Sequence, residues 1–255
     1  MAVMDEFRDK REAMKDQPLK EKLKYFRDYY LTTTLVVLAI LIGAIWLIKD
    51  MVSGKETAFN AVFVNSLQLK EDLAPFTDPF AELTGIDTQE YEVRIDSSYT
   101  LSDGSSYDEN SYYSMQIIMT RLAAQEIDVM AMDAANFTKY VYNETFADLR
   151  TVLPETLLGK LEAEGKVFYM DQAFLSTLAE LQEKIYEDPN AVIEYPQYTD
   201  PQAMEDPVPI GIRLTESPKF EEYFTYSSSE AYMGIAVNSL HQETAAAFIS
   251  YLFEE

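Results

Sequence analysis

Polar side chains that can hydrogen-bond a small ligand follow several short apolar runs of this sequence. Asn65 and Ser66 come after the run at residues 59–64, and Asp133 closes the run at residues 127–133. Where such runs form parallel strands, ligands bind beyond the carboxyl ends of the strands. The candidate residues for binding a small polar ligand are Asn65, Ser66, Ser97, Ser98, Tyr99, Asp133 and Ser217. The tyrosine of this set offers a stacking face, but Ser, Asn and Asp at such places also cap helices and form turns, which is their commoner role.

The loop at residues 96–110 is rich in oxygen ligands of the kind that calcium uses. It contains Asp96, Asp103, Asp108, Glu109 and Asn110. These residues lack the regular spacing of a calcium-binding loop, so we expect a solvated acidic loop and no metal site.

Enzymatic chemistry finds little support in the sequence. There is no cysteine, and His241 is the single histidine, so neither a thiol–imidazole pair nor a multi-histidine metal site can form. No G-x-S-x-G or phosphate-binding glycine pattern is present. Asp128 and Asp133 flank one apolar run at an odd separation, which places them on opposite faces of a strand and argues against a carboxylate pair. We therefore expect no catalysis and no cofactor.

The elements that must position the candidate residues alternate between strands and helices. Apolar runs predict strands at residues 59–67, 90–95, 127–133, 166–170, 209–214 and 232–238. Helical spacing predicts helices over 69–83, 136–142 and 172–186, one beginning at Pro154, one with Met115, Ile118, Met119 and Leu122 on its apolar face, and a last one capped by Ser239 and Gln242. This alternation predicts an α/β fold with a mainly parallel sheet flanked by helices over residues 58–255.

An uncharged stretch at residues 31–48 precedes this domain. With Tyr29 and Tyr30 before it, the stretch has about 20 residues, the length of a helix that crosses the hydrocarbon core of a bilayer. Trp46 and the two tyrosines lie near its ends, where aromatic rings favour the headgroup level. We expect a single transmembrane helix at residues 29–50, followed by a linker at residues 51–57. A buried helix of a soluble protein is the competing interpretation.

Basic residues give the expected helix a direction. Eight of them precede residue 31, whereas only Lys49 and Lys55 follow closely after the stretch, so the N-terminus is predicted to be cytoplasmic and the C-terminal domain extracytoplasmic. A cleaved signal peptide fits less well, because the basic arm and the apolar core are both too long. Residues 1–28 are expected to form a basic amphipathic arm that lies on the inner leaflet or docks a cytoplasmic partner.

The charge of the expected outer domain excludes one class of partner. Residues 1–49 hold nine of the 20 basic and seven of the 44 acidic residues, so the rest of the chain carries a net charge of −26. We expect such a domain to repel nucleic acid and anionic lipid surfaces. It could attract cations or basic partners, but acidity more often serves solubility. Without cysteine, its stability must come from a packed core.

Two segments resemble a known family. The strand at residues 127–133 with the following FADLRTVLP (residues 146–154), and the closing YMGIAVNSLHQETAAAFISYLFE, resemble parts of extracellular solute-binding proteins. The layout resembles a largely uncharacterised group of membrane-anchored, truncated, type 2 periplasmic-binding-protein-like domains of Gram-positive bacteria. The resemblance implies a ligand cleft between two lobes. Only residues 154–231 are left for a second lobe, so we expect one full lobe and at most a rudimentary second.

Two hypotheses about function follow. The first is a membrane-anchored extracytoplasmic binding module that recognises a small polar solute or an envelope partner without catalysis. The second is a structural or regulatory subunit of a membrane protein complex, which docks through the transmembrane helix and the outer lobe.

Overall fold

The structure is a computed structural model that describes residues 18–52, 54–102, 108–187, 195–196, 200–215, 217–228 and 230–253. The chain divides into two compact units, Met1–Gly54 and Lys55–Glu255. The boundary between them falls inside the expected linker. Residues 1–17 of the expected basic arm lie outside the described residues.

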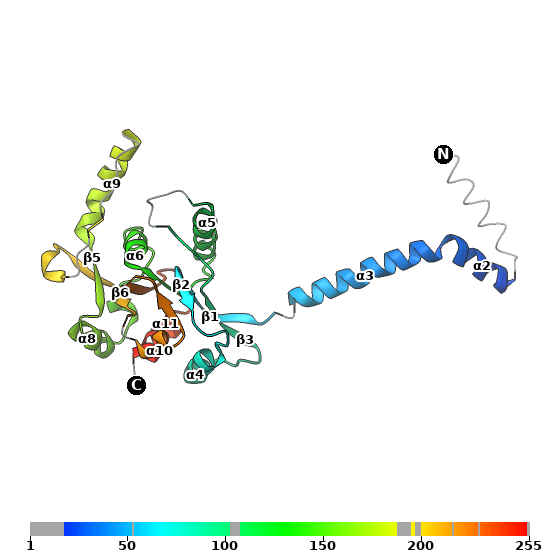
Figure 1. Cartoon of the computed structure of the whole chain (residues 1–255), viewed down its shortest axis with the longest axis horizontal. Coiled ribbons are helices and arrows are strands. Elements are labelled where there is room, and N and C mark those ends of the chain that lie inside the picture. The colour runs from blue at the N-terminus through cyan, green and yellow to red at the C-terminus, as the bar shows by residue number, and fades with distance from the viewer. Residues whose placement is uncertain are drawn as a thin grey trace. The chain divides into compact units, whose positions relative to one another are not determined.

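The described residues of the N-terminal unit form two helices, α2 (Leu19–Tyr29) and α3 (Leu31–Val52) (Figure 1). The expected continuous helix over residues 29–50 is therefore interrupted at Tyr30. No single helix among the described residues is long and apolar enough to cross a membrane, but Leu19–Asp28 and Leu31–Leu47 together meet that requirement as a pair bent by 66°. By length and composition alone, this pair could serve as a signal anchor or a broken span.

A six-stranded sheet forms the centre of the C-terminal unit. In spatial order its strands are β3 (Tyr91–Asp96), β1 (Glu56–Phe63), β4 (Val129–Asp133), β8 (Ala231–Ile235), β6 (Pro207–Arg213) and β5 (Val167–Asp171). β1 runs parallel to both of its neighbours, whereas the β4–β8, β8–β6 and β6–β5 pairs are antiparallel. The α/β class is confirmed, but the expectation of a mainly parallel sheet is wrong, because the sheet is mixed. A continuous apolar run reports that both faces of a strand are buried and carries no information on its direction.

Helices cover both faces of this sheet, because alternate residues of each strand point to opposite sides. Phe59, Ala61 and Phe63 of β1 pack into one core, whereas Val62 packs into the other. The first core is closed by α4 (Ala74–Thr84), α7 (Leu149–Val152), α8 (Glu155–Ala163) and α11 (Gln242–Phe253). The second core is closed by α5 (Glu109–Ala123), α6 (Ala134–Val141) and α9 (Gln172–Glu187). The unit is thus a three-layer sandwich (Figure 1).

A small two-stranded sheet was not predicted from the sequence. It joins β2 (Ser66–Gln68) to β7 (Phe224–Tyr226) in antiparallel register. β7 follows a single turn of helix, α10 (Pro218–Glu221), and a short 3-10 helix, η1 (Pro201–Ala203), precedes β6.

The region at residues 171–231, where a second lobe was in question, contributes to the same unit. Its described residues supply α9, η1, β6, α10 and β7, and β6 joins the main sheet between β5 and β8. Within the described part of this region, no separate lobe forms. Residues 188–194 and 197–199 lie outside the described residues.

Two helices differ in detail from the sequence-based expectation. On α5 the buried residues are Ser114, Ile118 and Leu122, whereas Met115 and Met119 are exposed. The buried face of α5 is therefore rotated about the helix axis relative to the predicted face. α11 begins at Gln242, and the hydroxyl of Ser239 donates to Asp128 instead of forming the expected capping box.

Candidate functional site

A cavity of about 540 Å³ lies where β1 and β4 end. Its lining residues are Asn65, Ser66, Leu67, Thr100, Leu101, Asp133, Asn136, Tyr226, Ser227 and Ser228. Three of the predicted ligand-binding residues, Asn65, Ser66 and Asp133, therefore come together here. We call this hollow the strand-end cavity.

Asp133 is the single charged residue among the described residues that line the strand-end cavity. It is the last residue of β4 and the N-cap of α6, and its Oδ1 accepts the backbone N–H of Asn136 at 3.1 Å. Its Oδ2 accepts from the side-chain amides of Asn65 at 2.7 Å and Asn136 at 3.0 Å. The negative charge is thus held in place by three donors. Carboxylate oxygens have further lone pairs, so additional donors can still bind.

Asn65 connects this carboxylate to the neighbouring loop. Its backbone has a φ of 60°, a left-handed conformation that Asn tolerates better than most residues. Its side chain donates to the carbonyl of Leu101 and accepts the Leu101 N–H, both at 2.8 Å. This one side chain therefore fixes both the loop and the carboxylate.

Two residues that line the strand-end cavity carry a hydroxyl group with no hydrogen-bond partner among the described residues. These groups are the buried Oγ of Ser66 and the buried Oη of Tyr226. The residues that carry them stand opposite each other in the β2–β7 pair. Burial raises the pKa of the Tyr226 hydroxyl well above its ordinary value, and the charge of Asp133 raises it further, so the group stays a neutral donor. Tyr226 was missed by the sequence analysis, because β7 is too short to give a recognisable pattern.

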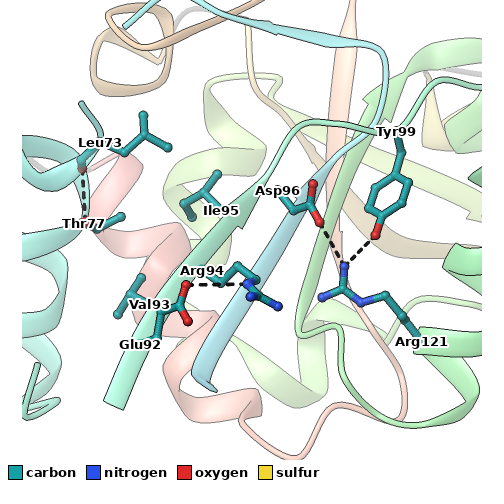
Figure 2. Close-up of a pocket in the computed structure, with 9 residues that line it drawn as sticks. All are labelled: Leu73, Thr77, Glu92, Val93, Arg94, Ile95, Asp96, Tyr99 and Arg121. Atoms are coloured by element: carbon teal, nitrogen blue, oxygen red, sulfur yellow. Dashed lines mark hydrogen bonds and ion pairs between the residues drawn. The ribbon is translucent and has the colours of Figure 1, made fainter. Parts of the chain in front are cut away.

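The structure places Tyr99 in a second hollow, of about 600 Å³, next to β3. Figure 2 shows Arg121 reaching from α5 to both Asp96 and Tyr99. Its Nη1 donates to Asp96 Oδ2 at 3.0 Å and to Tyr99 Oη at 2.8 Å. Burial alone would raise the pKa of Asp96, but hydrogen bonds from Ser98 and the charge of Arg121 outweigh it and lower this pKa. The hydroxyl of Tyr99 is therefore held by the same arginine that forms the ion pair with Asp96.

The three predicted serines outside the strand-end cavity have structural partners. Ser98 donates through its backbone N–H and its Oγ to Asp96 Oδ1, at 3.1 and 2.6 Å, and Ser97 Oγ donates to Gln68 Oε1 at 3.4 Å. Ser217 is fully buried, caps α10 and donates to the carbonyl of Leu252 at 2.9 Å.

A third polar cluster lies at the opposite end of β4 and was not expected. The buried Asp128 accepts from the backbone N–H of Asn60 at 2.9 Å and from Ser239 Oγ at 2.6 Å. His241 Nδ1 lies 3.2 Å from the same carboxylate, beside a hollow of about 430 Å³. Asp128 and Asp133 therefore belong to separate sites, because they lie at opposite ends of β4. The Asp128–His241 contact joins residues 113 positions apart, which a single sequence does not reveal.

The described residues hold no group of three or more Asp, Glu, His or Cys side chains placed to bind a metal. Asp108, a candidate in the acidic loop, accepts the backbone N–H groups of Asn110 and Ser111 as the N-cap of α5. Residues 103–107 of that loop lie outside the described part of the chain.

Comparison of the chain with protein-family models, curated proteins and solved structures finds no match.

Proposed function

We propose that this protein is a membrane-anchored binding module whose C-terminal unit holds a small polar solute in the strand-end cavity without transforming it. The observation that carries the proposal is the pair of buried hydroxyls, Ser66 Oγ and Tyr226 Oη, that lack a hydrogen-bond partner among the described residues and belong to residues that line the same hollow as Asp133. A buried polar group without a hydrogen bond costs about 1–3 kcal/mol, so a ligand that pairs with both groups recovers that cost.

The chemistry of the lining favours one class of ligand. Asp133 accepts hydrogen bonds, the two hydroxyls can donate or accept, and none of the lining residues that the structure describes is basic. An anionic solute would meet the charge of Asp133 without a compensating cation. We therefore infer a neutral or cationic solute rich in donors, such as a polyol, a sugar or an amine.

The N-terminal unit supports the proposed location. Its bent helix pair has the length and composition of a signal anchor or broken span, and Leu35, Ile40 and Trp46 on α3 are exposed. The excess of basic residues before α3 favours a cytoplasmic N-terminus and an extracytoplasmic C-terminal unit. A signal peptidase that released the C-terminal unit, or a protease added to intact cells that left it uncut, would contradict this arrangement.

The binding proposal is tested by thermal unfolding of the full chain in detergent, with sugars, polyols, amino acids and diamines as separate additives. A ligand at 100 times its Kd stabilises the folded state by about 2.7 kcal/mol, which raises the melting temperature measurably. Tyr226→Phe and Asp133→Asn should abolish the response. Tyr99→Phe, which changes a tyrosine outside the strand-end cavity, should keep it. A wild-type chain that responds to none of these classes would contradict the proposal.

The alternative function, a subunit of a membrane protein complex, is favoured by the outer face of α5. Between residues 110 and 120 this helix has no charged residue, and its exposed side chains include Tyr112, Tyr113, Met115, Ile117 and Met119. Aromatic and Met side chains are enriched at protein interfaces. Crosslinking in native membranes from a photoreactive residue at position 116 should then give one product of fixed mass, and no solute should shift the melting temperature.

A further inference from the structure

The two edges of the six-stranded sheet differ in exposure. Four of the five residues of the edge strand β5 are buried, whereas none of the six residues of the opposite edge strand, β3, is buried. The hollow of about 600 Å³ includes β3 from Glu92 to Asp96 (Figure 2). A smaller one of about 160 Å³ includes Tyr91 to Val93. Every residue of β3 therefore lines a hollow, and none of them is buried.

An open edge strand presents unpaired N–H and C=O groups that can pair with another strand. Charged side chains usually protect such an edge, and β3 carries Glu92, Arg94 and Asp96. The order of these three charges nevertheless allows one pairing between two copies of β3. If a second β3 lies antiparallel with Val93 opposite Val93, then Glu92 stands opposite Arg94 of the other copy, and Arg94 opposite its Glu92. Like charges would meet instead if the pairing were centred on Arg94, which would place Glu92 opposite Asp96.

On both faces of the paired strands, the residues that stand opposite each other are compatible. Val93 and Ile95 pack against the first core, so residues 91, 93 and 95 share that face and residues 92 and 94 share the other. The Val93-centred register places Tyr91 opposite Ile95 on the apolar face and opposite charges on the polar face. Opposed aromatic–aliphatic and opposite-charge pairs both stabilise antiparallel strands.

We propose that β3 is a homodimerisation edge, on which two copies of this chain pair antiparallel about Val93 and continue one sheet into the other. Such a contact is isologous, since the same residues of both copies meet across a two-fold axis. The self-complementary charge order of residues 92–94 carries the proposal and selects a second copy as the occupant.

A charge-exchange experiment tests the partner. The full chain, of 29.2 kDa, is examined by sedimentation equilibrium in density-matched detergent. Glu92→Arg alone and Arg94→Glu alone should each weaken the dimer by about tenfold or more, because like charges then face each other twice. An equimolar mixture of the two variants should restore it, and so should the double exchange. Both side chains are about half exposed, and recovery on mixing shows that both variants are folded. A monomeric wild type, single variants that stay dimeric through other contacts, or a mixture that stays monomeric would overturn the proposal.

Cysteine crosslinking tests the register, since the chain has no native cysteine. In a Val93→Cys variant the two introduced thiols would face each other with Cα atoms about 4.5–5.5 Å apart, within the range of a disulfide. In the matched Tyr91→Cys variant the two positions would lie about 13 Å apart along the strands. Mild oxidation should link the first variant and not the second. Equal linkage of both variants, or none of the first, would contradict this register.

Discussion

Ser66 and Tyr226 stand directly opposite each other in the antiparallel β2–β7 pair, and both of their hydroxyl oxygens are buried without a partner among the described residues. A two-stranded sheet of three residues per strand contributes little stability by itself. Its effect is to place a residue from near the start of the domain opposite one from near its end, and both of them line the strand-end cavity together with Asp133.

Removing the Tyr226 hydroxyl should leave stability unchanged or raise it. The Tyr226→Phe variant loses a buried group that pairs with no described residue, so we expect a gain of about 0–1 kcal/mol in the free energy of unfolding. Tyr99→Phe is the matched control and should lose about 1 kcal/mol, because the Tyr99 hydroxyl accepts a hydrogen bond from Arg121. Urea titration followed by far-ultraviolet circular dichroism measures both values. A loss above about 1 kcal/mol in Tyr226→Phe would mean that this hydroxyl is paired in the folded state.

Asn65 adopts a left-handed backbone conformation and also makes side-chain hydrogen bonds, and two substitutions distinguish the contributions of these two features to stability. Asn65→Gly removes the hydrogen bonds to Leu101 and Asp133 but keeps the left-handed conformation accessible. Asn65→Ala removes the same bonds and adds the cost of a Cβ at positive φ, about 1–2 kcal/mol. The alanine variant should therefore be the less stable by that amount in urea titration. Equal stability of the two would show that the backbone relaxes out of this conformation.

The buried carboxylate of Asp128 should be essential for stability. Asp128→Ala leaves the Asn60 N–H, the Ser239 hydroxyl and the His241 ring without their acceptor, and we expect a loss of about 3–5 kcal/mol. His241→Ala removes one partner that is partly exposed and should cost about 1 kcal/mol. Thermal unfolding compares the two variants. A smaller effect for Asp128→Ala than for His241→Ala would reverse our ranking of these residues.

The Asp96–Arg121 pair should make stability depend on acid pH. The pKa of Asp96 is lower in the folded chain than its ordinary value of 3.8, so its ionised form favours folding. This contribution is complete above about pH 5, one unit above the unfolded-state pKa, and is lost as the pH falls through the folded-state pKa. Asp96→Asn should therefore lower stability at neutral pH and flatten the decline below about pH 4. Asp78→Asn, an exposed substitution on α4, serves as the control. Parallel curves for wild type and Asp96→Asn would exclude this role.

Local patterns predicted the elements better than their arrangement. The run at residues 127–133 predicts β4 because Val129, Met130, Ala131 and Met132 are all buried. The same burial on both faces conceals that β8 lies antiparallel beside it. On α5, the apolar spacing of Met115 and Met119 predicts an inward face, but a helix with apolar residues all round fits more than one rotation, and Ser114 packs inward instead.

The candidate site was predicted in part, for a physical reason. Asn65, Ser66 and Asp133 lie at the carboxyl ends of predicted strands, so the rule for strand ends places them together. Tyr226 and Asn136 reach the same cavity through pairings and caps that depend on the three-dimensional fold. Tyr99 also follows a predicted strand, but Arg121 from α5 holds its hydroxyl beside Asp96.

β4 fixes where the two carboxylates lie relative to each other. This strand is buried, is hydrogen-bonded to β1 and β8, and has Asp128 just before its first residue and Asp133 as its last. A shift of β4 along its axis would break backbone hydrogen bonds to both neighbouring strands, each worth about 0.5–1.5 kcal/mol. The strand-end cavity and the Asp128 cluster are therefore held apart at a fixed separation by a single strand.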